Sequence, residues 1–348
     1  MKIFGLGKKQ AAARVCGALR LDAALLGLEK LRESPIRIMT YHRVMEARQL
    51  SNYPFDSDLI EVSTEELECQ LKYLTKHFDV INFVDVIAYM DDKAPLPKRP
   101  LLITFDDGFH DNYEIAFPVI KAIDVPVTML LATDYIGGKE TFWYDWLAFI
   151  VFNIKADVLF LDGEKVAFKL QASSAKRRTV FFHIINYLKG VSNEKRLQLL
   201  ANLREAYGSI YDDLSDDIKG LSQPMTWENV KEMSHAGIEF GSHTATHPFL
   251  PQVDKHQLKD ELQDSKKIIE QATGKAVSVV AYPNGQKDDF NDEIKAMAQE
   301  LGYRIGLSYI NGINHIGGFD PYEMKRMHVF PYHDLSLFKM ALILPEVF

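Results

Sequence analysis

The sequence has 348 residues, of which 47% are apolar and 25% are charged, a balance typical of a globular protein with a large core rather than of a disordered chain. Its formal net charge of -8 and the lack of a dense Lys/Arg stripe argue against nucleic acid as a partner. The two cysteines, Cys16 and Cys69, have neither metal-ligand spacing nor the density of a disulfide scaffold, which favours free thiols and a reducing compartment.

Residues 1–35 are predicted to form a helical segment that precedes the main domain, residues 36–348. Charged residues interrupt the apolar stretches of this segment, so it lacks the core of a signal peptide. Nowhere does the chain have the roughly 18 consecutive apolar residues that span a bilayer, and the expected location is cytoplasmic. Between residues 8 and 33, apolar and basic residues alternate in a loosely amphipathic pattern. This pattern predicts a helix packed against the domain or, alternatively, a peripheral contact with a membrane surface.

Short apolar or β-branched runs predict buried strands, and helical patterns lie between them. The predicted strands are residues 37–41, 101–105, 127–132, 238–241, 277–282 and 303–308. A capping box that starts at Ser63 predicts a helix, and residues 255–273 predict another that stops at Gly274. Strands that alternate with helices indicate a mainly parallel sheet, either open or closed into a barrel.

The alternation breaks between about residues 138 and 224, and this stretch is predicted to be a helical insertion. An aromatic run that contains Phe142, Trp143, Tyr144 and Trp146 opens it. These side chains either fill the core of a helical cap or form a wall of a substrate site.

Asp106 and Asp107 follow directly after the predicted strand at residues 101–105, and Gly108 comes next. Adjacent carboxylates at the end of a buried strand repel each other, so a cation or a shared proton should compensate them. The carboxyl ends of parallel strands are also where ligands bind in α/β folds. The alternative is a turn in which the acids cap the next helix and face water.

His243 and His247 form a second cluster, again directly after a predicted strand. Two histidines four residues apart in a helical turn present their rings on one side, and Pro248 limits how far a helix continues. Such a pair, with one carboxylate, can hold a divalent ion and leave coordination positions open for water. A single His-x-x-x-His pair also arises by chance on surface helices, but its combination with the paired acids is much more specific.

These residues resemble the polysaccharide deacetylases that share the NodB homology domain, also called carbohydrate esterase family four. The family's three motifs are similar, in order, to residues 104–108 (TFDDG), 243–247 (HTATH) and 282–285 (YPNG). Upstream, residues 39–44 look like the Tyr-His-x-Val strand of one branch of the family, and residues 125–128 fit its third strand. The resemblance covers about residues 36–140 and 225–333.

The resemblance implies an α/β fold, a distorted (β/α) barrel, with a divalent ion held by Asp107, His243 and His247. The ion is usually zinc in this family, with cobalt or nickel as alternatives, and Asp106 would be the general base. Elementary chemistry agrees, because a dication polarises an acetyl carbonyl and lowers the pKa of a bound water while a free carboxylate takes the proton. The expected activity is removal of N-acetyl groups from an amino sugar in a polysaccharide or a lipid-linked glycan precursor.

Departures from the family pattern affect the predicted site. Ala281 stands where many relatives have the arginine that orients the base, and the Asp-Trp pair that often follows the third motif is missing. The acid that protonates the leaving amine is usually a histidine on a late strand, and His328 and His333 both qualify. His328 is preferred, because a strand would aim its side chain inward. A core or capping histidine is the alternative for either.

His42, Trp143, Tyr282, Pro283 and Asn284 are the predicted substrate-binding residues. His42 would line the pocket from the first strand, or it would be a core histidine bonded to a backbone carbonyl. Trp143 would stack on a sugar ring, or it would fill the core of the insertion.

Two other functions stay open. An O-acetyl esterase would use the same metal, water and base. A non-catalytic glycan-binding protein is favoured by Ala281 and by the missing Asp-Trp pair. The intact acids and histidines argue against it, because a binding module needs no base beside a metal.

Overall fold

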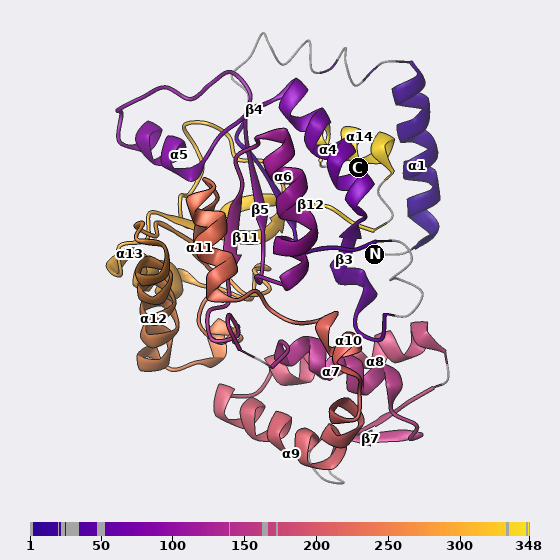
Figure 1. The fold of residues 1–348 in the computed structure, drawn as a ribbon. Helices are drawn as coiled ribbons and strands as arrows, with labels where there is room; N and C mark the ends of the chain where they lie inside the picture. Colours follow the sequence, from indigo (N-terminus) through magenta and orange to yellow (C-terminus); the bar gives the residue numbers. More distant parts are fainter. Residues whose placement is uncertain are drawn as a thin grey trace.

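The computed structural model describes residues 3–19, 21, 25, 35–46, 53–138, 140–161, 166–171, 173–331, 334–345 and 347. The central sheet consists of β1 (Arg37–Tyr41), β4 (Asp79–Val80), β5 (Pro100–Phe105), β6 (Thr128–Leu131), β9 (Glu239–Ser242), β10 (Val279–Ala281), β11 (Ile305–Asn311) and β12 (Met324–His328). The strand order is β1-β12-β11-β10-β9-β6-β5-β4, and an additional β1–β5 pairing closes the first seven strands into a barrel (Figure 1). All these pairings are parallel, so the predicted distorted (β/α) barrel is confirmed.

Helices surround the barrel (Figure 1). They are α4 (Thr64–His77), α5 (Phe83–Met90), α6 (Phe117–Ile123), α11 (Trp227–His235), α12 (Lys255–Thr273), α13 (Asp292–Glu300) and α14 (Leu335–Ile343). Successive strand side chains point to opposite faces of the sheet. Met39 and Ile103 therefore join the helix residue Leu71 in the largest apolar cluster, whereas their neighbours Ile38 and Leu102 belong to a separate cluster.

The closure of the barrel decides which residues meet at its carboxyl end. β1 and β5 pair in a register that sets Tyr41 opposite Phe105. The residues that follow these two, His42 after β1 and Asp106 after β5, therefore lie beside each other. All strands run in the same direction, so the residues that follow β9 and β10 reach the same end.

A helical layer lies between β6 and β9 in the sequence, in the stretch predicted as an insertion at about residues 138–224. Its elements are α7 (Trp143–Asn153), β7 (Val158–Phe160), β8 (Ala167–Lys169), α8 (Ser174–Lys189), α9 (Asn193–Asp212) and α10 (Asp216–Gly220). The layer has an apolar cluster largely its own, which includes Phe149, Ile184 and Leu199, and it occupies the bottom of Figure 1. Its two ends connect to adjacent strands, because β6 and β9 are paired.

The N-terminal helix α1 (Ile3–Ala18) packs against α14. Ala13 joins Leu337 and Met340 in a small apolar cluster, and Arg14 Nε lies 2.8 Å from Asp334 Oδ2. Much of the predicted amphipathic stretch, residues 20, 22–24 and 26–33, lies outside the described residues. Within the described part of the chain, no helix is both long enough and apolar enough to cross a membrane.

Candidate active site

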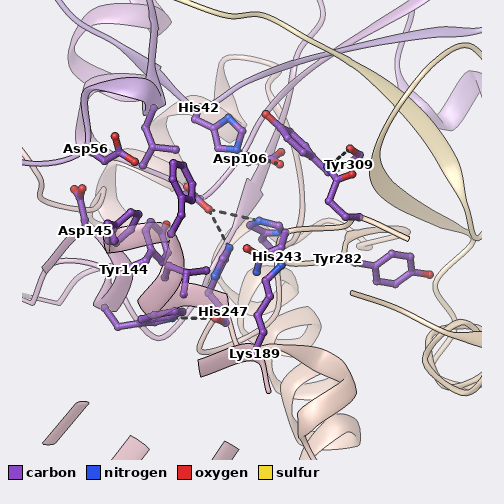
Figure 2. Close-up of a pocket in the computed structure, with 18 of the residues that line it drawn as sticks. His42, Asp56, Asp106, Tyr144, Asp145, Lys189, His243, His247, Tyr282 and Tyr309 are labelled. Atoms are coloured by element: carbon purple, nitrogen blue, oxygen red, sulfur yellow. Dashed lines mark hydrogen bonds and ion pairs between the residues drawn. The ribbon is translucent and has the colours of Figure 1, made fainter. Parts of the chain in front are cut away.

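A cavity of about 330 Å³ opens at the carboxyl end of the barrel (Figure 2). The barrel contributes residues that follow its strands, among them His42, Asp106, Asp107, His243, His247 and Asn284. The helical layer contributes Trp143, Tyr144 and Asp145 from α7 and Phe181, Phe182, Ile185 and Lys189 from α8. The barrel and the helical layer therefore build the cavity together.

Asp107, His243 and His247 form a cluster that could hold a metal ion, because their ligand atoms all lie within 4.8 Å of one another. Asp107 Oδ1 is 3.5 Å from His243 Nε2 and 3.6 Å from His247 Nε2 (dashed lines in Figure 2). His243 Nδ1 lies 2.9 Å from the carbonyl oxygen of Ala281. When Nδ1 donates its proton to that carbonyl, the lone pair of Nε2 on the other side of the ring is free to bind a metal ion beside Asp107.

The surroundings of the cluster fit a cation. All three side chains are buried, and Asp107 Oδ1 makes no hydrogen bond to any described residue. Burial raises the pKa of Asp107, because an ionised carboxylate is unfavourable away from water. A divalent ion would supply the positive charge that compensates the ionised carboxylate.

The loop that carries the two histidines does not form the helical turn expected from the sequence. Thr244 and His247 have positive φ angles of 68° and 53°, which most residues adopt only when other contacts hold them there. Glu261 of α12 supplies such contacts. Its Oε2 atom accepts hydrogen bonds from the backbone N–H of Ala245 at 2.9 Å and of Thr246 at 2.8 Å. An irregular loop braced by a helix therefore directs both rings at the carboxylate.

Asp106 is held by Arg326 of β12, whose Nη1 atom is 2.7 Å from Asp106 Oδ1. Burial disfavours the charged carboxylate, but Arg326, His243 and His42 outweigh it and lower the pKa of Asp106 to about 2. Arg326 is fixed in turn by a hydrogen bond from its Nε to the carbonyl oxygen of Ser308 at 2.7 Å. The guanidinium of Arg326, on the last barrel strand, therefore holds Asp106 in place. Ala281, at the position where many relatives have the orienting arginine, has no such group.

His42 lines the cavity and is bound to Glu61, which comes from β3 (Ile60–Val62) beside β2 (Arg43–Val44). His42 Nδ1 lies 2.9 Å from Glu61 Oε1, and its Nε2 lies 3.9 Å from Asp106 Oδ2. Burial lowers the pKa of the ring, but Glu61, with Asp106 and Asp107, outweighs burial and raises it to about 9. The ring therefore carries a proton at neutral pH and faces the second carboxylate oxygen of Asp106.

His328 is not among the described residues that line the cavity. Its ring stacks on Tyr309, with centroids 3.6 Å apart and planes 11° apart. Burial, with the charges of Arg326 and His42, lowers the pKa of His328 to about 3, so the ring is neutral at pH 7. The strand turns the side chain onto Tyr309, so its position does not support the preference for His328 as the acid, which stays a prediction. His333 lies outside the described residues.

Three of the predicted substrate-binding residues besides His42 line the cavity, namely Trp143, Tyr282 and Asn284. The lining contributed by the described residues does not include Pro283. The Asn284 Nδ2 atom is buried and donates to no described residue, so a ligand could accept its hydrogen bond. The hydroxyl of Tyr282, in contrast, donates to the carbonyl oxygen of Tyr322 at 3.0 Å.

Trp143 borders the cavity and also packs against the apolar cluster of the helical layer, and its stacking on a sugar ring stays a prediction. Its Nε1 donates to the carbonyl oxygen of His247 at 3.0 Å, and the guanidinium of Arg196 lies 4.8 Å from its ring. The tryptophan therefore braces the histidine loop and also borders the cavity. Trp146, only 3% exposed, is a core residue of the helical layer.

Several lining residues were absent from the sequence prediction. They are Phe182, Ile185, Lys189 and Tyr309, together with Glu61 behind His42. The spacing of Phe182, Ile185 and Lys189 places them on one side of a helix, and this was the available signal. Periodicity alone could not show that this side faces a cavity.

A family model described as "Polysaccharide deacetylase" matches residues 174–306. Poly-beta-1,6-N-acetyl-D-glucosamine N-deacetylase of Staphylococcus aureus (strain MSSA476) is 32% identical over 117 residues, which are 32% of this chain and 40% of that protein. Putative polysaccharide deacetylase YxkH of Bacillus subtilis (strain 168) is 22% identical over 82% of this chain and 68% of its own length. The solved structure of Streptococcus pyogenes deacetylase PplD in complex with acetate aligns with a TM-score of 0.56 at 19% identity, over 89% of this chain and 98% of that one. The structural likeness shows a shared fold. The match to the staphylococcal relative spans less than half of that protein.

Proposed function

Because this chain belongs to the polysaccharide deacetylase family, we propose that it is a metal-dependent hydrolase that removes N-acetyl groups from an amino sugar in a glycan. The observation that carries this proposal is the different surroundings of two adjacent acids. Asp107 faces two imidazoles, whereas Asp106 faces a guanidinium and the protonated ring of His42. Such a difference separates the roles of two carboxylates, one as a ligand and the other as a base.

Zn²⁺ is the proposed ion, with Co²⁺ and Ni²⁺ as alternatives, and Asp107, His243 and His247 would hold it. One carboxylate and two imidazoles suit these ions and leave coordination positions open. When bound, the ion would polarise the acetyl carbonyl and lower the pKa of a water molecule.

Asp106 is the proposed base, which accepts a proton from the attacking water. Its low pKa keeps it ionised at neutral pH, and Arg326 holds one oxygen while the other faces His42. His42 is the proposed acid, which donates its Nε2 proton to the nitrogen as the C–N bond breaks. Glu61 fixes the ring through Nδ1 and keeps it protonated until that step.

Activity should fall as the pH rises through the pKa of His42, about 9, because only the protonated ring can protonate the nitrogen. Glu61→Gln should move this alkaline limb to lower pH, since the Glu61 carboxylate raises the pKa of His42. His42→Asn should lower kcat by about 10²–10⁴-fold and remove the limb. Profiles of kcat/KM against pH would measure all three.

Glu65→Gln is the matched control, because Glu65 is exposed in the first turn of α4. An alkaline limb that stays in place in Glu61→Gln would mean that a group other than His42 titrates there.

A second hollow of about 360 Å³ adjoins the cavity, and Lys189 and Gln286 line both. At their boundary Lys189 Nζ pairs with Asp289 Oδ1 at 2.8 Å, joining α8 to the barrel. The amide side chains of Asn186 and Gln252 line the second hollow. Amides can donate to and accept from sugar hydroxyls. The two hollows together suit neighbouring sugars of a chain, which favours a glycan oligomer or polymer as the substrate.

Asn186→Ala and Gln252→Ala should each raise KM for a tetrasaccharide by about 2- to 10-fold, the loss expected for one hydrogen bond. KM for a single N-acetylated sugar should stay constant, because it would occupy the first cavity alone. Steady-state acetate release over a series of chain lengths measures this difference. Gln271→Ala, at an exposed position of α12, is the control. Equal effects on short and long substrates would rule out the second hollow as a subsite.

The proposed function is tested by acetate release from β-1,6-linked N-acetylglucosamine oligomers with the zinc-loaded protein, and from O-acetylated glycans in parallel. We expect release from the N-acetylated oligomers. Faster release from O-acetylated glycans that persists in His42→Asn would favour an esterase, because an ester needs less protonation of its leaving group. Binding of the oligomers without release would favour a glycan-binding protein.

A further inference from the structure

The first turn of α7 attaches the helical layer to the metal-binding loop and to the barrel. Trp143 Nε1 donates to the carbonyl oxygen of His247. Two residues later, Asp145 Oδ2 lies 3.4 Å from Arg43 Nη1 and accepts a hydrogen bond from Ser222. These contacts fix the backbone on both sides of Tyr144, which lines the cavity (Figure 2).

Tyr144 lies directly against the metal-binding residues. Its ring centroid is 4.8 Å from that of His247, and it stacks on Phe142 at 5.5 Å. Its hydroxyl oxygen is buried and makes no hydrogen bond of normal geometry to any described residue, but it lies within reach of the Asp107 carboxylate. A tyrosine hydroxyl carries its proton at neutral pH, so Tyr144 is a donor, and buried donors normally have an acceptor.

We propose that Tyr144 is a further catalytic residue, whose hydroxyl donates a hydrogen bond to the oxygen of the scissile acetyl group. This inference rests on the proposed function. In that reaction the water oxygen bonds to the carbonyl carbon, Asp106 takes the water proton, and an electron pair moves onto the carbonyl oxygen. The pair then returns, the C–N bond breaks, and His42 protonates the nitrogen, which gives acetic acid and a free amine. The acid ionises in water to acetate, Asp106 releases its proton to solvent, and His42 takes one up again.

Tyr144 keeps its own proton throughout and stabilises the negative charge while it resides on the oxygen. The donor comes from α7, so the barrel strands alone would not complete the site.

The alternative acceptor for this hydroxyl is the Asp107 carboxylate. A hydrogen bond to Asp107 would make Tyr144 a positioning residue that holds a metal ligand and does not touch the substrate. The two roles predict different results when the hydroxyl is removed. Loss of a positioning contact weakens metal binding, whereas loss of a donor to the substrate lowers kcat and leaves metal binding unchanged.

Tyr144→Phe removes only the oxygen atom and tests the proposal. We expect kcat for an N-acetylated oligomer to fall by about 10²-fold, with KM and the zinc dissociation constant unchanged. A phosphonate that replaces the planar acetyl group by a tetrahedral anion should lose affinity by a similar factor, because it resembles the charged intermediate. Tyr113→Phe is the matched control, since its hydroxyl donates to Glu232 outside the cavity at 2.7 Å.

The other outcomes separate a failure of this inference from a failure of the proposed function. Zinc affinity that weakens in step with activity would assign Tyr144 to holding Asp107 and overturn the proposal. An unchanged kcat in Tyr144→Phe, with an active wild-type protein, would overturn it and leave the proposed function standing. A zinc-loaded wild-type protein that releases no acetate from any N-acetylated glycan would refute the proposed function, and this inference with it.

Discussion

Asp106→Asn should reduce kcat by about 10²–10⁴-fold, the contribution of one general base, while the protein still binds its metal. Asparagine keeps the shape of the side chain and can still accept a hydrogen bond from Arg326, but it cannot take a proton from water. Acetate release at saturating substrate measures the loss, and metal content is measured on the same samples. A variant with nearly wild-type activity would show that another group is the base.

The contact between Arg326 and Asp106 should also determine how activity depends on pH. Asp106 can act as a base only when ionised, so activity is lost as the pH falls through its pKa, which its surroundings lower to about 2. Arg326→Gln removes one of the charges that lower this pKa, and the loss of activity should therefore begin at a higher pH. Arg304→Gln is the control, because it breaks an ion pair with Asp91 that lies outside the cavity.

The double variant His243→Ala/His247→Ala should bind no metal, whereas the wild-type protein should hold about one divalent ion per chain. Two of the three ligands are lost, and Asp107 alone is a weak site for these ions. Mass spectrometry of protein purified without chelators measures the content. Acetate release should disappear with the metal, and zinc should raise the melting temperature of metal-free wild-type protein, because it binds the folded state.

His256→Ala is the control for this experiment. His256 is exposed on α12 and pairs with Asp260 at 2.9 Å, outside the cavity. Wild-type protein that stays metal-free after incubation with zinc, cobalt and nickel would contradict the assigned ligands and with them the hydrolytic mechanism.

The parts of the fold and site that the sequence predicts are those encoded locally. Several strands of the barrel contain short apolar runs, and Asp106, Asp107 and His243 come directly after predicted strands. Parallel strands end at one edge, so these residues meet wherever the strands pair. The fold and the ligand cluster therefore follow from strand positions and motif order, without knowledge of side-chain packing.

The parts that the sequence does not predict depend on pairings between distant segments. Arg326 reaches Asp106 across 220 residues, and Glu61 reaches His42 through the pairing of β2 with β3. The position of His328 also depends on which face of β12 turns toward the cavity. A one-residue change of register would turn its side chain to the other face, and sequence patterns do not fix register so closely.

The prediction of a helical turn at His243 and His247 was wrong for a related reason. Spacing alone suggested a helical turn, but Thr244 and His247 adopt left-handed backbone conformations. Glu261 holds the loop from another helix, and no local signal marks that contact.

Because β6 and β9 are hydrogen-bonded neighbours, the helical layer leaves the barrel and returns to it at adjacent points. A segment joined in this way can change in length and sequence while every strand keeps its register. Natural selection can therefore vary α8, and the cavity wall that it carries, much as loops vary on an immunoglobulin domain. The contacts of the first turn of α7 with Arg43 and His247 limit this freedom near the metal ligands. Under the proposed function, new glycan specificities can thus evolve while the residues around Asp106 and Asp107 stay unchanged.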